Sequence, residues 1–314
     1  MTTVVIPAHN EGRVIRRLLE QLINGADPGE MDIIVVANGC ADDTAEVAAS
    51  FGPAVRVLTL PVASKHEALT AGDRAAAGFP RIYVDADVEL RVHDVRALAA
   101  ALCQPGVLAA APRREQVMTG RPWQVRWYYD VWMLLPGVQR GLWGRGAIAV
   151  NEAGHRRLGG LPPLQADDLA ASLMFEPHET ALVPGAQVII HPPRTFAGLL
   201  YRRARCVTGA AQIERAQGPN GSADRTRISD LTAIIRRRPG MLLRVGYFLS
   251  VGVFARLRAS RARARGDYPT WLRDESSRTA AAQSAAPPSG ARPAVPVAAV
   301  PRQPEGRDHV PHNR

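Results

Sequence analysis

Short aliphatic segments alternate with longer amphipathic segments through the first half of the chain, and this alternation limits the fold more than any other feature. The aliphatic segments are TVVIP (3–7), DIIVVA (32–37), AVRVLTL (54–60) and RIYV (81–84). Helix-like segments at 13–24, 42–51 and 65–78 lie between them. Because buried parallel strands are almost continuously apolar and are joined by helices, the pattern predicts an α/β domain with a mixed, mainly parallel sheet.

Polar side chains follow three of these predicted strands. The polar segments are PAHNE (7–11), NGCADDT (38–44) and DAD (85–87). Each one taken alone is explained by turn and helix-start chemistry. Ligands of open α/β sheets bind beyond the carboxyl ends of the strands, so three such loops at one sheet edge predict a binding site.

The DAD segment raises a question of charge. Asp85 and Asp87 are two residues apart at the end of a strand and therefore share one side of the chain. Two carboxylates held together need a cation, a proton or open water. Carboxylate oxygens suit magnesium or manganese, so the pair predicts a divalent cation held against a diphosphate.

Composition narrows the class of protein. The chain has 314 residues, of which 46% are hydrophobic, which is sufficient for a sizeable core. Cys40, Cys103 and Cys206 are far apart in the sequence and are expected to be reduced thiols in a cytoplasmic protein. The first residues lack the pattern of a secretory signal. The net charge of +10 favours anionic partners, and nucleic acid, anionic lipid and a diphosphate substrate all fit that charge.

The second half of the chain differs from the first. The residues Trp123, Trp127, Tyr128 and Trp132 follow a near-helical spacing, which favours core packing over the stacking of a sugar or lipid. Residues 166–176 are predicted to form a short helix, and residues 196–216 a basic helix.

The C-terminal part combines apolar and basic segments. Residues 241–255 predict an apolar helix whose uninterrupted portion falls short of the roughly 18 residues that span a bilayer. Five arginines follow within residues 256–265, which suits a peripheral contact with an anionic membrane surface, although a solvated helix end is an equal alternative. The Ala- and Pro-rich residues 266–314 predict disorder, after a catalytic domain over 1–215 and a basic helical extension over 216–265.

Four segments, in order, resemble the motifs of one enzyme family. VVIPAHNE is similar to the family's first-strand PxYNE motif, with His9 where an aromatic residue is usual, and VVANGCADDT is similar to VDDGSxDxT. SKHEALTAGDRAA resembles a GKaxALNxG segment, and VDADV resembles the D-x-D motif itself. The sequence therefore resembles the inverting family 2 glycosyltransferases with a GT-A fold.

The resemblance implies a nucleoside-diphosphate sugar as donor and a divalent cation, Mn²⁺ or Mg²⁺. It places the donor at Pro7, His9, Glu11, Asn38, Lys65 and Asp85, and the cation at Asp85 and Asp87. His9, Asn38 and Lys65 are expected to contact the nucleotide, and Glu11 to support its pocket. By resemblance only, uridine and guanosine diphosphates are the expected carriers.

The acceptor side of the family is resembled by GRGAIAVNEAGHRRLGGLPPLQADDLAASL. This puts Asp167 and Asp168 on the family's acidic pair, with Asp168 as general base. Without the resemblance, both would be read as residues that favour a helix start. Arg202 and Arg205 recover part of the family's QxxRW motif and could grip a phosphate or meet acidic neighbours.

His191, at the end of the segment VIIH, is a candidate third metal ligand, although a single histidine is more often structural. The leading hypothesis is a metal-assisted, inverting glycosyltransferase with an unknown acceptor. One alternative is a retaining transferase that acts on a small phosphorylated acceptor. The other is a non-catalytic protein that binds a membrane or nucleic acid through its arginines, of which nucleic acid is the weaker prediction.

Overall fold

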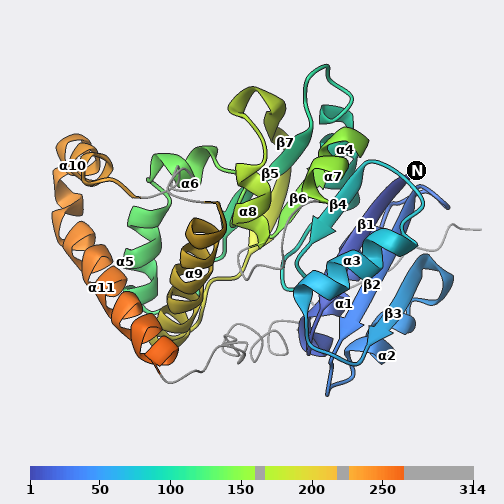
Figure 1. Cartoon of the computed structure of the whole chain (residues 1–314), viewed down its shortest axis with the longest axis horizontal. Helices are drawn as coiled ribbons and strands as arrows, with labels where there is room; N and C mark the ends of the chain where they lie inside the picture. The colour runs from blue at the N-terminus through green and yellow to red at the C-terminus, as the bar shows by residue number, and fades with distance from the viewer. Residues whose placement is uncertain (160–166, 218–225, 265–314) are drawn as a thin grey trace, which may run out of the picture.

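The computed structural model describes residues 1–159, 167–217 and 226–264, and its centre is a seven-stranded sheet (Figure 1). The strands are β1 (Thr2–Ala8), β2 (Met31–Asn38), β3 (Val55–Leu60), β4 (Arg81–Val84), β5 (Ala109–Gln116), β6 (Ala147–Val150) and β7 (Thr180–Ile190). Their order is β3-β2-β1-β4-β6-β5-β7. The strands β1 to β4 are parallel, β6 is antiparallel to both of its neighbours, and β5 pairs in parallel with β7. The predicted mixed, mainly parallel sheet is confirmed.

Helices cover both faces of the sheet and form a second group beside it. They are α1 (Gly12–Ile23), α2 (Thr44–Ala49), α3 (Lys65–Ala75), α4 (Val92–Ala101), α5 (Trp123–Trp132), α6 (Pro136–Arg140), α7 (Glu152–Leu158), α8 (Asp167–Leu173), α9 (Phe196–Gln217), α10 (Ile228–Arg237) and α11 (Leu242–Ala264). The largest apolar cluster joins α1, α2 and α4 to one face. The other face packs against α3 and, through a separate cluster, against α7 and Phe175, just after α8 (Figure 1).

Local sequence explains how the first helices form. The buried residues of α1 are Val14, Ile15, Leu18, Leu19 and Leu22, which follow the three- and four-residue spacing of a single helix face. At α3 the chain changes direction at Ser64, whose hydroxyl accepts a hydrogen bond from the Glu67 amide at 3.2 Å. This N-cap satisfies one of the unpaired amides of the first turn and fixes Lys65 as the first helical residue.

A second group of helices lies beside the sheet (Figure 1). Helices α5, α9, α10 and α11 share one apolar cluster, in which the rings of Tyr128 and Phe248 stack with centroids 4.9 Å apart. The expectation of core packing fits Tyr128, which is 2% exposed, but not Trp123, which is 53% exposed at the start of α5. Trp123 instead packs edge-on against Trp127 at the surface.

The C-terminal helix is longer than the sequence predicted, because α11 continues to Ala264. Within the part of the chain that the structure describes, the segment Pro239–Arg261 is the one helix long and apolar enough to cross a membrane by length and composition. The basic helix predicted over 196–216 is found as α9. The disorder predicted for 266–314 concerns residues outside those described.

Candidate active site

The ends of β1, β2 and β4 meet the start of α3 at one edge of the sheet. This convergence follows from the parallel register, in which Ala8 of β1 lies beside Ala37 of β2 and Val5 lies beside Tyr83 of β4. The loop after each strand therefore opens at the same side of the molecule. The three polar segments that the sequence singled out are brought together in this way.

The acidic residues after β4 keep the alternation of a strand although the strand ends at Val84. Asp85, Asp87 and Glu89 are partly exposed, and the residues between them are buried. Asp85 and Asp87 are thus both accessible at this edge of the sheet. The backbone amide of Asp85 donates a hydrogen bond to the Gly146 carbonyl at 2.8 Å, which ties the end of β4 to the start of β6.

Two cationic side chains offset the negative charge of these carboxylates. Lys65 Nζ lies 2.8 Å from Asp85 Oδ1. Arg202, on α9, has a pKa above its usual value because the charges of Tyr129, Asp87 and Asp85 outweigh the opposing effect of burial. A lysine from the first half of the chain and an arginine from the second half therefore interact electrostatically with these acidic residues.

Glu89 extends this acidic row and was missed by the sequence analysis. Its Oε1 lies 2.6 Å from His191 Nε2 and 3.3 Å from Arg17 Nε, and its Oε2 accepts a hydrogen bond from Gln21. The hydrogen bond from His191, helped by Gln21 and Arg17, lowers the pKa of Glu89 to about 2 against the effect of burial. The signal was present in the sequence, because Glu89 continues the two-residue spacing of Asp85 and Asp87.

His191 is held by Glu89 through Nε2, so a metal ion would have to reach its other ring nitrogen. Metal-binding histidines commonly pair their second nitrogen with a carboxylate in this way. No cluster of three or more His, Cys, Asp or Glu side chains suited to a metal is formed among the described residues. The residues that would hold a divalent cation at this edge are Asp85 and Asp87, because their carboxylate oxygens are the ligands that Mg²⁺ and Mn²⁺ prefer.

Asn38 shapes the site from beneath. Its side chain is 1% exposed, donates to the carbonyl oxygens of Ala8 and Val36, and accepts from the Ser64 amide at 3.1 Å. His9 Nδ1 lies 2.6 Å from the backbone carbonyl oxygen of Asn38. This oxygen can only accept a hydrogen bond, so Nδ1 carries the proton. The expected direct contact between the Asn38 amide and a nucleotide is not available in this arrangement, because both ends of the amide are buried against protein.

The loop after β1 is locked to the loop after β2. The Glu11 amide donates to the Thr44 hydroxyl at 2.7 Å, and the Glu11 side chain is 6% exposed. Asn10 adopts a positive φ of 50° and accepts from the Ala41 amide at 2.7 Å. Glu11 is accordingly placed to support this loop, while Pro7, at the end of β1, reaches the neighbouring pocket.

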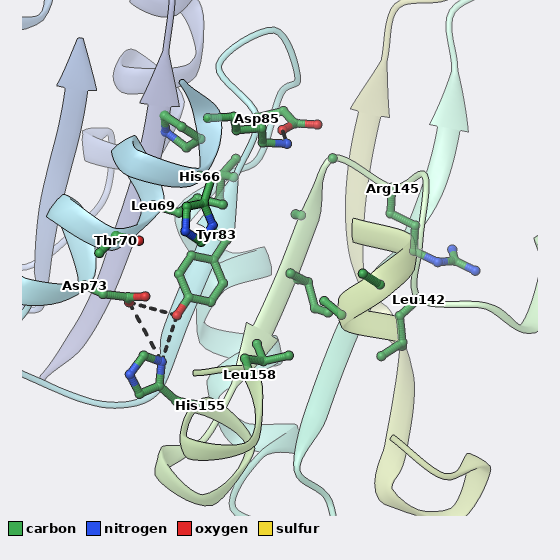
Figure 2. Close-up of a pocket in the computed structure, with 18 of the residues that line it drawn as sticks. His66, Leu69, Thr70, Asp73, Tyr83, Asp85, Leu142, Arg145, His155 and Leu158 are labelled. Carbon is green, nitrogen blue, oxygen red and sulfur yellow. Dashed lines mark hydrogen bonds and ion pairs between the residues drawn. The ribbon is translucent and has the colours of Figure 1, made fainter. Parts of the chain in front are cut away.

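A cavity of about 180 Å³ runs from the acidic edge down between α3 and the pair α7 and α8 (Figure 2). Pro7, Lys65 and Asp85 line it at the sheet edge. Ala170 and Ala171 line it from α8, so the cavity connects Asp85 to that helix. Most of its remaining wall is apolar, as in pockets that hold small molecules.

The far end of the cavity is polar. Asp73 Oδ1 accepts from the Tyr83 hydroxyl at 2.8 Å and from Arg81 at 2.9 Å, and His155 Nδ1 lies 3.0 Å from the Tyr83 oxygen (Figure 2). Burial lowers the pKa of His155 even though Asp73 opposes this shift. Burial and the Asp73 charge together raise the pKa of Tyr83 above its usual range. No sequence signal joins these residues, which come from α3, β4 and α7.

The structure gives less information about the other site residues that the sequence predicted, which lie on α8 and α9. Asp167 and Asp168 are the first two residues of α8, one turn before Ala170 and Ala171, but their side chains lie outside those described. Arg205 lies one turn after Arg202 on α9 and forms no ion pair with any residue that the structure describes.

The family model described as glycosyl transferase family 2 matches residues 3–157, a segment that contains β1 to β6 and the D-x-D pair. The chain belongs to glycosyltransferase family 2. It is accordingly a glycosyltransferase. The sequence resemblance to this family is confirmed. A search of curated proteins found no significant sequence match.

Solved structures of glycosyltransferases share the fold of this family 2 chain. The mannosyltransferase PcManGT from Pyrobaculum calidifontis, in complex with GDP-Man and Mn²⁺, has a TM-score of 0.54 at 20% identity, over 85% of this chain and 81% of that one. Glucosyl-3-phosphoglycerate synthase from Mycobacterium tuberculosis, in complex with Mn²⁺, UDP-Glc and phosphoglyceric acid, has a TM-score of 0.52 at 21% identity, over 70% and 80%. At this identity the likeness establishes the GT-A fold.

Proposed function

We propose that this family 2 glycosyltransferase moves a sugar from a nucleoside-diphosphate sugar to an acceptor hydroxyl in one inverting displacement. The observation that carries the proposal is the ion pair of Asp85, at the end of β4, with Lys65 in a cavity that reaches α8. Asp87 is two residues further along, and Arg202 interacts electrostatically with both carboxylates. Carboxylates and cations so combined suit a metal-bound diphosphate.

The donor lies at the ends of β1, β2 and β4 in this proposal. Pro7 and His9 border the nucleotide, Lys65 pairs with a phosphate, and Asp85 meets the ribose. Glu11 and Asn38 act through the backbone of the loops that they hold. A divalent cation such as Mn²⁺ or Mg²⁺, bound by Asp85 and Asp87, supplies Lewis-acid stabilisation of the leaving diphosphate. Arg202 and Arg205 add positive charge on the same side.

Asp168 is the proposed general base, and Asp167 is its neighbour on α8. The acceptor oxygen forms a bond to the anomeric carbon while the bond from that carbon to the diphosphate oxygen breaks. The hydroxyl proton passes to the carboxylate of Asp168, and the nucleoside diphosphate leaves. Attack on the face opposite the leaving group inverts the anomeric centre.

The acceptor enters through the cavity in this proposal, and the polar group formed by Asp73, Tyr83 and His155 faces its far end. A retaining transfer to a small phosphorylated acceptor is the second candidate. The phosphoglyceric acid in the M. tuberculosis structure is the observation that favours it. Proton NMR of the anomeric signal in the product distinguishes the two mechanisms.

The test is a panel of UDP- and GDP-sugars with Mn²⁺, read first by thermal shift and then by release of the nucleoside diphosphate. We expect at least one donor to raise the melting temperature in a metal-dependent way. Asp87→Asn should abolish the shift. Asp27→Asn, which changes a carboxylate with 87% exposure far from the site, is the matched control. A panel in which no donor binds, with or without metal, would contradict the proposal.

A further inference from the structure

The outer face of α11 is an apolar stripe with no protein element packed over it in the described residues (Figure 1). Ten large hydrophobic residues are strongly exposed in the described chain, and six of them belong to this helix. They are Leu242, Leu243, Leu249, Val253, Phe254 and Leu257, with exposures between 48% and 74%. From Leu242 to Leu257 the stripe runs for about 22 Å, at 1.5 Å per residue. Soluble surfaces rarely leave so long an apolar stripe uncovered.

The inner face of the same helix is part of the protein core. Val245 and Val251 are almost fully buried in the cluster that α11 shares with α5 and α9, and Ala255 is fully buried as well. From Val245 to Ala255 the two faces together make α11 largely apolar, although only one face has a partner within the described protein. The outer stripe is therefore available to a different apolar phase.

Positive charge surrounds this stripe. Arg236, Arg237 and Arg238 are exposed at the turn before Leu242, and Arg256 and Arg258 are exposed among the last apolar residues. The sequence contains no Asp or Glu from residue 231 to residue 266. An apolar stripe flanked by these cations is complementary to a surface that is apolar inside and anionic outside.

We propose that α11 and the end of α10 dock this protein in the plane of an anionic lipid bilayer, with the stripe in the interface and the arginines among the headgroups. The helix cannot cross the bilayer without taking its partners with it. Arg244 pairs with Asp130 of α5 at 3.1 Å, and Arg258 lies over the Tyr201 ring of α9 at 4.0 Å. Spanning would bury these charged contacts in hydrocarbon or uncover the inner face, and both are costly.

The proposal is independent of the transfer reaction, and its test needs no sugar donor. The full chain is floated with vesicles of phosphatidylcholine and with vesicles that also contain phosphatidylglycerol. We expect binding to the anionic vesicles, and release from them at high salt because headgroup attraction is screened. The double variant Leu249→Glu with Phe254→Glu should lower the binding by about tenfold or more. Replacing Arg236, Arg237 and Arg238 by Gln should weaken it by a similar factor.

Val62→Glu is the matched control, because Val62 is an apolar residue with 56% exposure outside α11. It should bind vesicles as the unchanged chain does, and a thermal melt verifies that every variant is folded. Failure of the unchanged chain to bind either vesicle overturns the proposal. So does a dimer, detected by light scattering, that the Leu249 and Phe254 changes dissociate, since the stripe would then contact a second copy. Retention through salt and alkaline washing would indicate a spanning helix and would overturn the in-plane arrangement.

Discussion

The ammonium group of Lys65 lies 2.8 Å from the Asp85 carboxylate and so joins the first residue of α3 to the first residue after β4. Both side chains are partly exposed, at 29% and 42%, so the pair adds little to the stability of the fold. The pair matters instead because it lies at the edge of the sheet where the donor is proposed to bind. Lys65 pairs with Asp85 in the structure, and under the proposed function it would pair with a phosphate of the donor once Asp85 binds the metal ion.

This exchange predicts opposite effects of Lys65→Met on two ligands. Mn²⁺ should bind the variant about two- to fivefold more tightly without nucleotide, because it no longer competes with an ammonium group. The nucleotide donor should bind about tenfold more weakly, because a charged hydrogen bond to phosphate is lost. Titration calorimetry with Mn²⁺ alone, and then with donor at saturating Mn²⁺, measures both. A parallel loss of both affinities would contradict the exchange.

Asp85→Asn and Asp87→Asn should each lower the rate of transfer by about a hundredfold or more, the usual effect of removing one group that stabilises a leaving charge. The melting temperature without ligand should change little, because both side chains are partly exposed. Initial rates of nucleoside-diphosphate release check the first expectation, and melting curves check the second. Unchanged rates in both variants would remove these residues from the mechanism.

Asp168→Asn should reduce transfer by about a hundredfold to ten-thousandfold while donor binding stays near that of the unchanged chain. Asp167→Asn is the matched comparison, since it changes the adjacent carboxylate. Single-turnover rates and donor affinity, measured on both variants, separate the general base from its neighbour. Equal transfer by Asp168→Asn and the unchanged chain would favour the retaining mechanism.

The polar end of the cavity offers a test of stability and of acceptor binding together. Asp73→Asn removes the charge that Arg81 and Tyr83 contact, and should lower the free energy of unfolding by about 1–3 kcal/mol. Tyr83→Phe removes one hydroxyl and should have a smaller effect. Urea denaturation measures both changes. If the cavity admits the acceptor, Tyr83→Phe should also raise the acceptor KM and leave the donor KM unchanged.

Glu89 predicts how stability depends on pH. Its pKa is lowered from 4.5 to about 2 in the folded chain, mainly by the hydrogen bond from His191. The unfolded chain therefore binds more protons between these values, so this contribution is complete above pH 4.5 and is lost as pH falls toward 2. Urea denaturation from pH 6 downward should show this loss for the unchanged chain. Glu89→Gln should flatten the profile in the same window.

The first half of the fold could be predicted because each of its strands and helices is marked by residues close together in the sequence. Apolar strands, capped helices and polar strand ends each carry a signal within a few residues, so β1 to β4 and the acidic pair were found from the sequence. The strand β6 has four residues and no alternation, and it follows a Gly-rich segment, so only its pairing with β4 and β5 defines it. The sequence of β6 alone therefore did not predict a strand.

The site likewise has residues that local motifs predict and residues that only contacts between distant segments define. Asp85, Asp87 and Lys65 lie in motifs that point to phosphate chemistry, and the structure places them together. The roles of Asn38 and His155 depend on contacts across distant segments, such as Asn38 with Ser64 and His155 with Tyr83. Spacing along the chain cannot show such contacts, nor that an amide in a ligand-binding motif turns away from solvent.

The hydrogen bond from the Asp85 amide to the Gly146 carbonyl joins the end of β4 to the start of the antiparallel β6. Gly146 has a positive φ of 67°, and a Cβ at this position would collide with Val88 Cγ1, so the seam tolerates only glycine without a shift. Any change of length in the segment before β6 would thus be transmitted straight to the acidic pair. To adapt this enzyme to a new acceptor, substituting side chains inside the cavity is therefore safer than replacing the segment before β6.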